Sequence, residues 1–330
     1  MTRETINLKV GEPSFYQEYW ANNSVSEIVS SDSIYDYPIV NNKLIQSIIN
    51  LHESIHGFRL VPDNIVIGNG ASQLISASMY AKKLIHLKVK VPYWPRIPEL
   101  CIMGGYKQNL LISQDSWNHF LISPNNPDGA VAPLEEILSA STVDSCYNWP
   151  QYVSFGIVNS VLPDISLYSL SKAMGLAGLR LGWAITKNPL LAEEMRHYVE
   201  YSTAGVSVDT QSKASNYISY AESKLVDGED VFSWASGELQ YRWSKVMDAF
   251  DGTAIIPMNN GKGMFIWLHA PSLSDLPLHL EEYYGIISMS GSDCGVNNHY
   301  ARLNLACHAK EFDKFIKRVE NAKIITSNKP

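Results

Sequence analysis

The amino-acid sequence predicts an α/β protein, with a mostly parallel central sheet in a large domain and a smaller α+β domain. Short apolar strands alternate with helical patterns as far as about residue 190, an order typical of parallel sheets. Several of these strands run directly into loops rich in glycine, proline or asparagine, where such sheets bind ligands. After residue 190 long helical stretches come first and a few strands follow. We therefore expect residues 25–205 to form the large domain, and residues 1–24 with 206–330 to form the small one.

Composition excludes several classes of protein. The 330 residues are 45% hydrophobic and 18% charged, which is typical of a globular chain with a substantial core. A net charge of −7 argues against general nucleic-acid binding. No run of 18 apolar residues occurs, and the N-terminus lacks the apolar stretch of a signal peptide. Four scattered cysteines without a C-x-x-C pair indicate reduced thiols, so we expect a cytoplasmic protein that binds neither membrane nor nucleic acid.

The elements of the large domain follow in order. Residues 41–57 predict a helix, because apolar residues recur at helical spacing and Gly57 can end it. A strand at 65–67 runs into a glycine turn and a second helical pattern, a geometry that presents free N–H groups to an anion. Further strands are predicted at 88–91, 120–123, 165–170 and 181–186, and a short helix at 133–140.

The elements of the small domain are mainly helical. Long helical stretches are predicted at 190–225 and 230–250, and strands at 264–268, 285–289 and 301–305. A last amphipathic helix carries Phe312, Phe315, Ile316 and Val319 on one face. We expect these four side chains to pack in the core.

The stretch from Ser169 to Arg180 carries the chemistry. It reads S-x-S-K up to Lys172, and Arg180 follows eight residues later with Gly175 and Gly178 between them. A lysine amine becomes a useful nucleophile when its surroundings lower its pKa or when it forms a Schiff base. A serine hydroxyl and a forked guanidinium suit a phosphate, and glycines allow close approach of the backbone to a ligand. This combination indicates pyridoxal 5'-phosphate (PLP), an aldehyde with a phosphate arm.

Other loops supply what PLP chemistry requires: a carboxylate for the ring nitrogen, donors to the ring hydroxyl, an aromatic face and N–H groups for the phosphate. The candidates, in chain order, are Gly70, Ala71, Ser72, Tyr93, Asn126, Asp144, Tyr147, Lys172 and Arg180. Each has a plain structural alternative: residues 126–129 make a good β-turn, Asp144 could be a solvated acid, and Tyr147 a core aromatic. Their joint presence favours the cofactor site.

These motifs resemble the fold-type I PLP enzymes, the aspartate aminotransferase superfamily, and within it the alliinase and tryptophan-aminotransferase-like group. The matching stretches are 11–20, 68–73, 123–129, 144–152, 169–183 and 302–305. The resemblance implies that Lys172 holds the cofactor and shuttles the proton, while Asp144 pairs with the pyridine nitrogen. It also implies that Asn126 and Tyr147 bond the ring hydroxyl, and that Tyr93 stacks on the ring, although neighbouring Trp94 could do so.

The same resemblance assigns the phosphate and the substrate. The backbone of Gly70, Ala71 and Ser72, together with Ser169 and Arg180, is expected to hold the phosphate. Tyr37 resembles a tyrosine that reaches a neighbouring subunit's phosphate in a homodimer, or is a core tyrosine. Arg302 resembles the arginine that grips the substrate α-carboxylate in a bidentate pair, with Gly11 and Asn126 nearby.

A competing motif is present at residues 52–56, which read H-E-x-x-H on a predicted helix. In zinc proteases this spacing places two imidazoles on one helix face, and a third ligand follows downstream. Between Asp63 and Glu99 the chain has no carboxylate, and its only histidine there is His86. We therefore expect His52 and His56 to be structural, with no metal bound.

The predicted function is PLP-dependent transamination of an α-amino acid with a keto-acid acceptor. The aromatic residues Phe15, Tyr16, Tyr19 and Trp20 point to an aromatic or large apolar substrate, or simply to packing. One alternative is a β-eliminating C–S lyase, which uses the same catalytic residues. A non-enzymatic PLP-fold binding module is the other, and the presence of Lys172, Asp144 and Arg302 argues against it.

Overall fold

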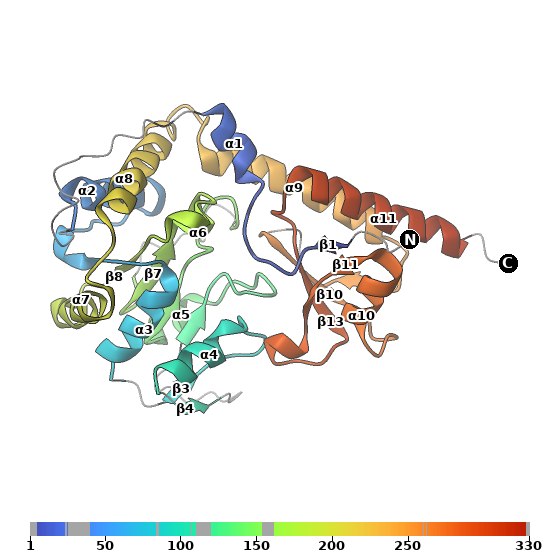
Figure 1. Ribbon diagram of the computed structural model, residues 1–330, viewed down its shortest axis with the longest axis horizontal. Coiled ribbons are helices and arrows are strands. Elements are labelled where there is room, and N and C mark those ends of the chain that lie inside the picture. The colour runs from blue at the N-terminus through green and yellow to red at the C-terminus, as the bar shows by residue number, and fades with distance from the viewer. Residues whose placement is uncertain are drawn as a thin grey trace.

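Two sheets organise the chain in the computed structural model, which describes residues 5–23, 25, 40–83, 86–105, 107–109, 120–153, 162–259, 261 and 263–327. Tyr37 lies outside the described residues. The large sheet has the order β2-β8-β7-β6-β5 and the small sheet the order β12-β13-β10-β9. Figure 1 shows the two sheets in separate halves of the molecule, with the N-terminal segment passing between them.

The large sheet is formed by β2 (Ile65–Gly68), β5 (Phe120–Ile122), β6 (Thr142–Asp144), β7 (Ser166–Ser169) and β8 (Gly182–Ile185). Strands β5, β6 and β7 are parallel, and β8 runs antiparallel to both β7 and β2. Four of these five strands therefore point the same way, which confirms the predicted mostly parallel sheet. The exception arises because the loop after β7 turns straight back, so that Gly182 pairs with Ser169.

Helices cover both faces of the large sheet, as its two-sided apolar pattern requires. Val66, Leu167 and Ala184 belong to one core cluster, with residues of α3 (Ala71–Ala81) and α7 (Pro189–Thr203). The alternate strand positions belong to the other cluster, with residues of α2 (Asn42–His56) and α8 (Val208–Ser223). Helix α8 packs on α2, although the predicted boundary at residue 205 assigns α8 to the small domain and α2 to the large one. The domain division stays a prediction.

The small sheet is antiparallel and consists of β9 (Ile256–Pro257), β10 (Phe265–His269), β12 (Met289–Ser290) and β13 (Tyr300–Asn304). One face packs on α9 (Val231–Phe250) and α11 (Ala309–Ser327), which lie side by side in Figure 1. The four apolar residues predicted for the last helix are buried here: Phe312, Phe315, Ile316 and Val319. Near the same core, β1 (Ile6–Asn7) pairs in parallel with β11 (Ile286–Ile287).

The remaining elements are short: α1 (Tyr16–Asn22), β3 (His86–Lys88), α4 (Arg96–Met103), β4 (Lys107–Asn109), α5 (Leu134–Ser139), α6 (Leu170–Ala173) and α10 (Leu276–His279). Two differences from the prediction are local. The helical stretch 190–225 is broken where Ala204 and Gly205 adopt positive φ, and the strand expected at 88–91 lies at His86–Lys88 instead. None of the described helices combines the length and apolarity needed to cross a membrane.

Candidate active site

Eight of the predicted site residues meet at one edge of the large sheet. Strands β2, β5, β6 and β7 all end there, because they point the same way. A cavity of about 380 Å³ opens at this edge. Its lining includes the predicted ring contacts Asn126, Asp144, Tyr147 and Lys172, and the predicted phosphate contacts Ala71, Ser72, Ser169 and Arg180. Residues from four separate loops therefore form a single site.

Lys172 sits on the one-turn helix α6, directly after β7. Ser169 caps this helix, since its hydroxyl accepts a hydrogen bond from the N–H of Ser171 at 3.1 Å. The Lys172 amine donates to the carbonyl oxygen of Gly11. Burial lowers the pKa of Lys172 to about 8. An amine with this pKa is largely neutral in mildly alkaline solution, as a nucleophile or proton acceptor must be.

Asp144 is the last residue of β6 and is only 5% exposed. One carboxylate oxygen accepts the N–H of Cys146 at 3.0 Å, and burial raises the pKa of the carboxyl group. Within the described ranges it has no ion-pair partner at salt-bridge distance. A buried carboxylate of this kind calls for a cationic or N–H partner in the cavity.

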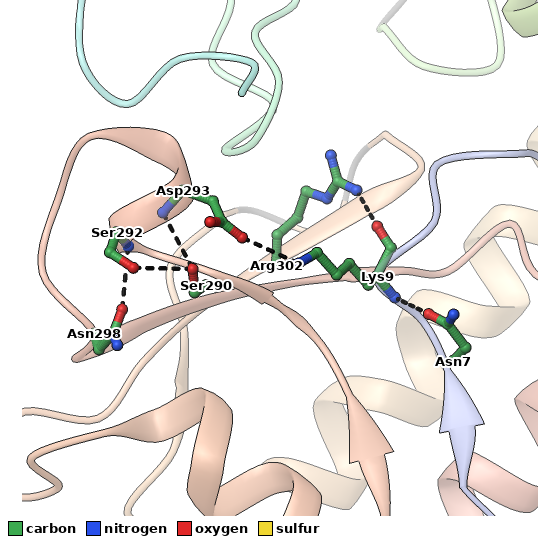
Figure 2. Close-up of polar contacts among 7 residues, drawn as sticks. All are labelled: Asn7, Lys9, Ser290, Ser292, Asp293, Asn298 and Arg302. Carbon is green, nitrogen blue, oxygen red and sulfur yellow. Dashed lines mark hydrogen bonds and ion pairs between the residues drawn. The ribbon is translucent and has the colours of Figure 1, made fainter. Parts of the chain in front are cut away.

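A hydrogen-bonded chain connects the cavity to the small sheet. The Asn126 amide donates to the hydroxyl of Tyr147 at 3.2 Å and accepts from Arg302 Nη1 at 2.7 Å. Arg302 Nη2 donates to the carbonyl of Lys9 at 2.5 Å, and the guanidinium lies 4.1 Å from the ring centre of Phe265. Figure 2 shows the Arg302 side chain extending from the small sheet toward Lys9, whose ammonium pairs with Asp293 at 3.2 Å.

Arg302 is 1% exposed, yet its Nε has no hydrogen-bond partner in the described part of the chain. Burial lowers the pKa of its guanidinium, which nevertheless stays a cation. An unpaired N–H on a buried cation is costly unless an acceptor meets it. Arg302 is not itself a lining residue, and Asn126 connects this buried cation to the cavity wall.

The opposite end of the cavity is built for an anion. Gly70 has φ +79° and precedes α3, whose first-turn N–H groups have no helical acceptors. This φ favours glycine, and a Cβ at Gly70 would lie 2.6 Å from Arg180 Nη2, so the guanidinium lies directly against this turn. Arg180 itself has φ +51°, and its Nη1 donates to the carbonyl of Ala177 at 3.1 Å. Helix N–H groups and a guanidinium together form a phosphate cradle.

The aromatic face of the cavity comes from Trp94. Tyr93, the predicted stacking residue, points elsewhere: its ring packs against Gly295, where a Cβ would lie 2.5 Å from it. Its backbone N–H donates to the carbonyl of Cys294 at 3.1 Å. Trp94 lines the cavity instead.

Several lining residues lay outside the predicted set: Glu12, Arg96, Cys146 and Ser171. Ser171 stands inside the S-x-S-K motif, and Arg180 Nη1 lies 3.4 Å from its hydroxyl. Glu12 follows Gly11, the residue whose carbonyl accepts the Lys172 amine. These two neighbours of predicted residues could have been found from the motifs; Arg96 carried no such signal.

The aromatic N-terminal residues do not line the cavity. Phe15, Tyr16 and Tyr19 are at most 5% exposed and pack around Trp234. They belong to the hydrophobic core between α1, α2 and α9. The packing interpretation of these residues therefore holds, and they give no support to an aromatic substrate.

The H-E-x-x-H residues lie in the core, away from the cavity. His52 and His56 are 0% and 3% exposed and stack on each other with centroids 4.8 Å apart, whereas Glu53 is exposed. His52 Nε2 accepts the indole N–H of Trp183 at 2.9 Å, and burial lowers the pKa of His56 to about 3. No cluster of metal-ligating side chains occurs among residues that the structure describes.

The residues of the cavity fit PLP as a set. Lys172 supplies an amine for its aldehyde, Asp144 a buried carboxylate for its ring nitrogen, and the cradle at Gly70 and Arg180 a place for its phosphate. Comparison with known proteins agrees with this fit. A family model described as "Allinase" matches residues 6–323.

Among curated proteins, tryptophan aminotransferase-related protein 2 of Arabidopsis thaliana is 26% identical, covering 96% of this chain and 81% of its own length. Alliin lyase of Allium cepa var. aggregatum is 25% identical over 73% of this chain and 61% of its own. Among solved structures, aspartate aminotransferase of Thermotoga maritima has a TM-score of 0.74 at 17% identity, covering 97% of this chain and 92% of that one. This chain therefore has the PLP-dependent fold type I, as the sequence predicts. The match over nearly the whole length shows that this chain belongs to the allinase family, whose enzymes depend on PLP.

Proposed function

We propose that the protein is an aminotransferase that moves the amino group of an α-amino acid to a keto acid. Arg302 is the observation that supports this most strongly. It is a buried cation whose Nε has no hydrogen-bond partner among the described residues, and Asn126 ties it to the wall of the Lys172 cavity. Such a group suits the carboxylate common to amino acids and keto acids.

When bound, PLP supplies an aldehyde that condenses with amines and a ring that withdraws electrons from the substrate's Cα. Asp144 would face the ring nitrogen, and its negative charge keeps a proton there. Asn126 and Tyr147 would bond the ring hydroxyl, and Trp94 would cover one face of the ring. Lys172 would hold the aldehyde carbon.

The phosphate would lie at the N-terminus of α3. The N–H groups of Ala71 and Ser72, the hydroxyls of Ser169 and Ser171, and the guanidinium of Arg180 line that end of the cavity. These groups neutralise and orient the phosphate. Tyr37 stays a proposed contact to the phosphate of a second subunit in a homodimer, which sedimentation analysis would test.

The proton is moved by Lys172. Its pKa of about 8 leaves a useful fraction of neutral amine near neutral pH, able to accept a proton from the substrate's Cα and return it. The Gly11 carbonyl gives this amine a hydrogen-bond acceptor at the mouth of the cavity. Arg302 holds the carboxylate meanwhile, so that Cα stays within reach of the amine.

A β-eliminating C–S lyase is the second candidate, favoured by the similarity to alliin lyases. A single-turnover experiment separates the two. Phenylalanine has no leaving group at Cβ, so an aminotransferase should convert its bound PLP to pyridoxamine phosphate, and a keto acid should restore the original absorbance. If a panel of amino acids yields no pyridoxamine phosphate while S-alkyl cysteines release pyruvate and ammonia, the lyase is correct.

A further inference from the structure

One N-terminal segment, residues 9–20, touches both halves of the active site. On the small sheet, the carbonyl of Lys9 accepts from Arg302 at 2.5 Å, and that of Glu12 accepts from the Asn304 amide at 2.8 Å. Phe15 donates its N–H to the carbonyl of Ala306 at 3.1 Å. These bonds fix the first half of the segment along β13, the strand that carries Arg302.

The second half of the segment reaches the helix that carries Lys172. Helix α6 has a single turn. The carbonyl of Leu170 accepts the N–H groups of Met174 and Leu176, but the carbonyl groups after it lack the partners that a longer helix provides. Side-chain donors replace the missing backbone donors at three successive carbonyl groups. Tyr152 donates its hydroxyl to the carbonyl of Lys172 at 2.9 Å, the Gln151 amide donates to Ala173 at 3.0 Å, and the Trp20 indole donates to Met174 at 2.9 Å.

Tyr16 joins these caps to the segment. Its hydroxyl accepts the Gln151 amide at 2.9 Å and lies 3.5 Å from the hydroxyl of Tyr152. The Tyr16 ring packs so closely on Gly175 that a Cβ there would lie 2.5 Å from it. Tyr16, Gln151 and Tyr152 are 1%, 5% and 3% exposed, so water does not compete for these bonds.

We infer that Tyr152, Gln151 and Trp20 are positioning residues for Lys172. Through them, residues 9–20 fix the position of the Lys172 amine relative to Arg302. A one-turn helix cannot hold its own backbone rigidly, because it has almost no internal hydrogen bonds. The three caps supply that rigidity from outside. Since the same segment also binds the Arg302 guanidinium, displacement of the segment would change the separation of the amine and the carboxylate site. This inference rests on the proposed role of Lys172.

The test measures cofactor binding in three single variants. Tyr152→Phe and Trp20→Phe each remove one cap on α6 and keep a ring in place. Tyr19→Phe is the matched control, since its hydroxyl is also buried in this segment but donates to Glu229 at 3.1 Å rather than to α6. PLP is removed from each holoprotein, and the protein is then titrated with PLP to measure its affinity. The pH at which the absorbance change of the bound cofactor is half complete is also recorded. Melting temperatures of the stripped proteins report the fold.

Both cap variants should bind PLP roughly three- to tenfold more weakly, the range for one hydrogen bond, and shift the absorbance midpoint by about half a pH unit or more. The control should change neither quantity. If both cap variants match the control in binding and midpoint while only melting temperatures fall, the caps are merely structural and the inference fails. Borohydride labelling of the native protein is done first: a label on a lysine other than Lys172 refutes the proposed function instead. Should Tyr152→Phe not fold, Trp20→Phe decides.

Discussion

Two groups of buried titratable side chains differ in what surrounds them. Lys172 and Asp144 line a cavity at the ends of parallel strands, beside further charged groups. His52 and His56 are enclosed by aromatic rings, with Trp149 and Tyr168 packed against them. Both groups belong to sequence motifs with catalytic precedents. The difference shows that a motif indicates chemistry only when its side chains reach a space that a ligand can enter.

The largest expected effect is on Lys172. Lys172→Ala removes the only amine lining the cavity among the described residues, so activity should fall by about 10³-fold or more. The native protein should be yellow, and borohydride reduction should fix the label on Lys172, as peptide mass spectrometry would show. Lys82→Ala is the control, because Lys82 pairs with Asp164 outside the cavity. A label at any other lysine would show that the Lys172 cavity is not the cofactor site.

Arg302→Lys should have the next largest effect. Lysine keeps the charge but loses the fork, so carboxylate binding should weaken by about 1.5–3 kcal/mol, or roughly 10- to 150-fold in KM. Arg302→Ala should be worse. Steady-state kinetics with amino acids measure the change, and amines without a carboxylate serve as the internal control, since they should lose little. Unchanged turnover of amino acids by Arg302→Lys would mean that another residue binds the carboxylate.

The pH dependence of cofactor capture should report the environment of Lys172. Burial lowers its pKa from 10.5 to about 8, so the amine is neutral above pH 8 and protonated below it. The rate at which stripped protein captures PLP should rise about tenfold per pH unit below pH 8 and level off above it. Stopped-flow absorbance between pH 6.5 and 10 measures this. A rate that keeps rising to pH 10 would indicate an ordinary, solvated lysine.

The histidines should show the smallest effects, confined to stability. His52→Phe leaves the Trp183 N–H buried without an acceptor, which costs about 1–3 kcal/mol of unfolding free energy. His56 has no hydrogen-bond partner in the described residues, so His56→Phe should cost less, within about 1.5 kcal/mol. Urea unfolding measures both. Stoichiometric zinc in the purified protein, with activity lost to a chelator, would instead place these residues in a metal site.

Part of the site could be predicted from sequence because Asn126 and Lys172 follow apolar runs that read as strands. These runs are β5 and β7, Asp144 ends β6 between them, and parallel strands bring their ends to one edge. The fold class followed from the same alternation. A pattern of apolar residues does not determine the path of a loop. The antiparallel return of β8 after Lys172 could therefore not be predicted from it.

The choice between neighbours in a loop was also beyond the sequence. Tyr93 and Trp94 are both aromatic, and no periodicity applies between Pro92 and Pro95 to say which one faces the cavity. Contact with Gly295, two hundred residues away, decides the direction of Tyr93. The caps on α6 could not be predicted for the same reason, since Trp20 and Tyr152 reach its carbonyl groups only in the folded chain.

The bonds of the N-terminal segment also constrain when the site can form during synthesis. Ile6 pairs with Ile286, Lys9 with Arg302, and Phe15 with Ala306, so this segment depends on residues that are synthesised much later. The strands of the large sheet are all synthesised by residue 185, and the helices that cover its two faces by residue 223. The partners of the N-terminal segment on β13 come later still. The lysine loop is therefore synthesised well over a hundred codons before the segment that contacts its helix can reach its own partners.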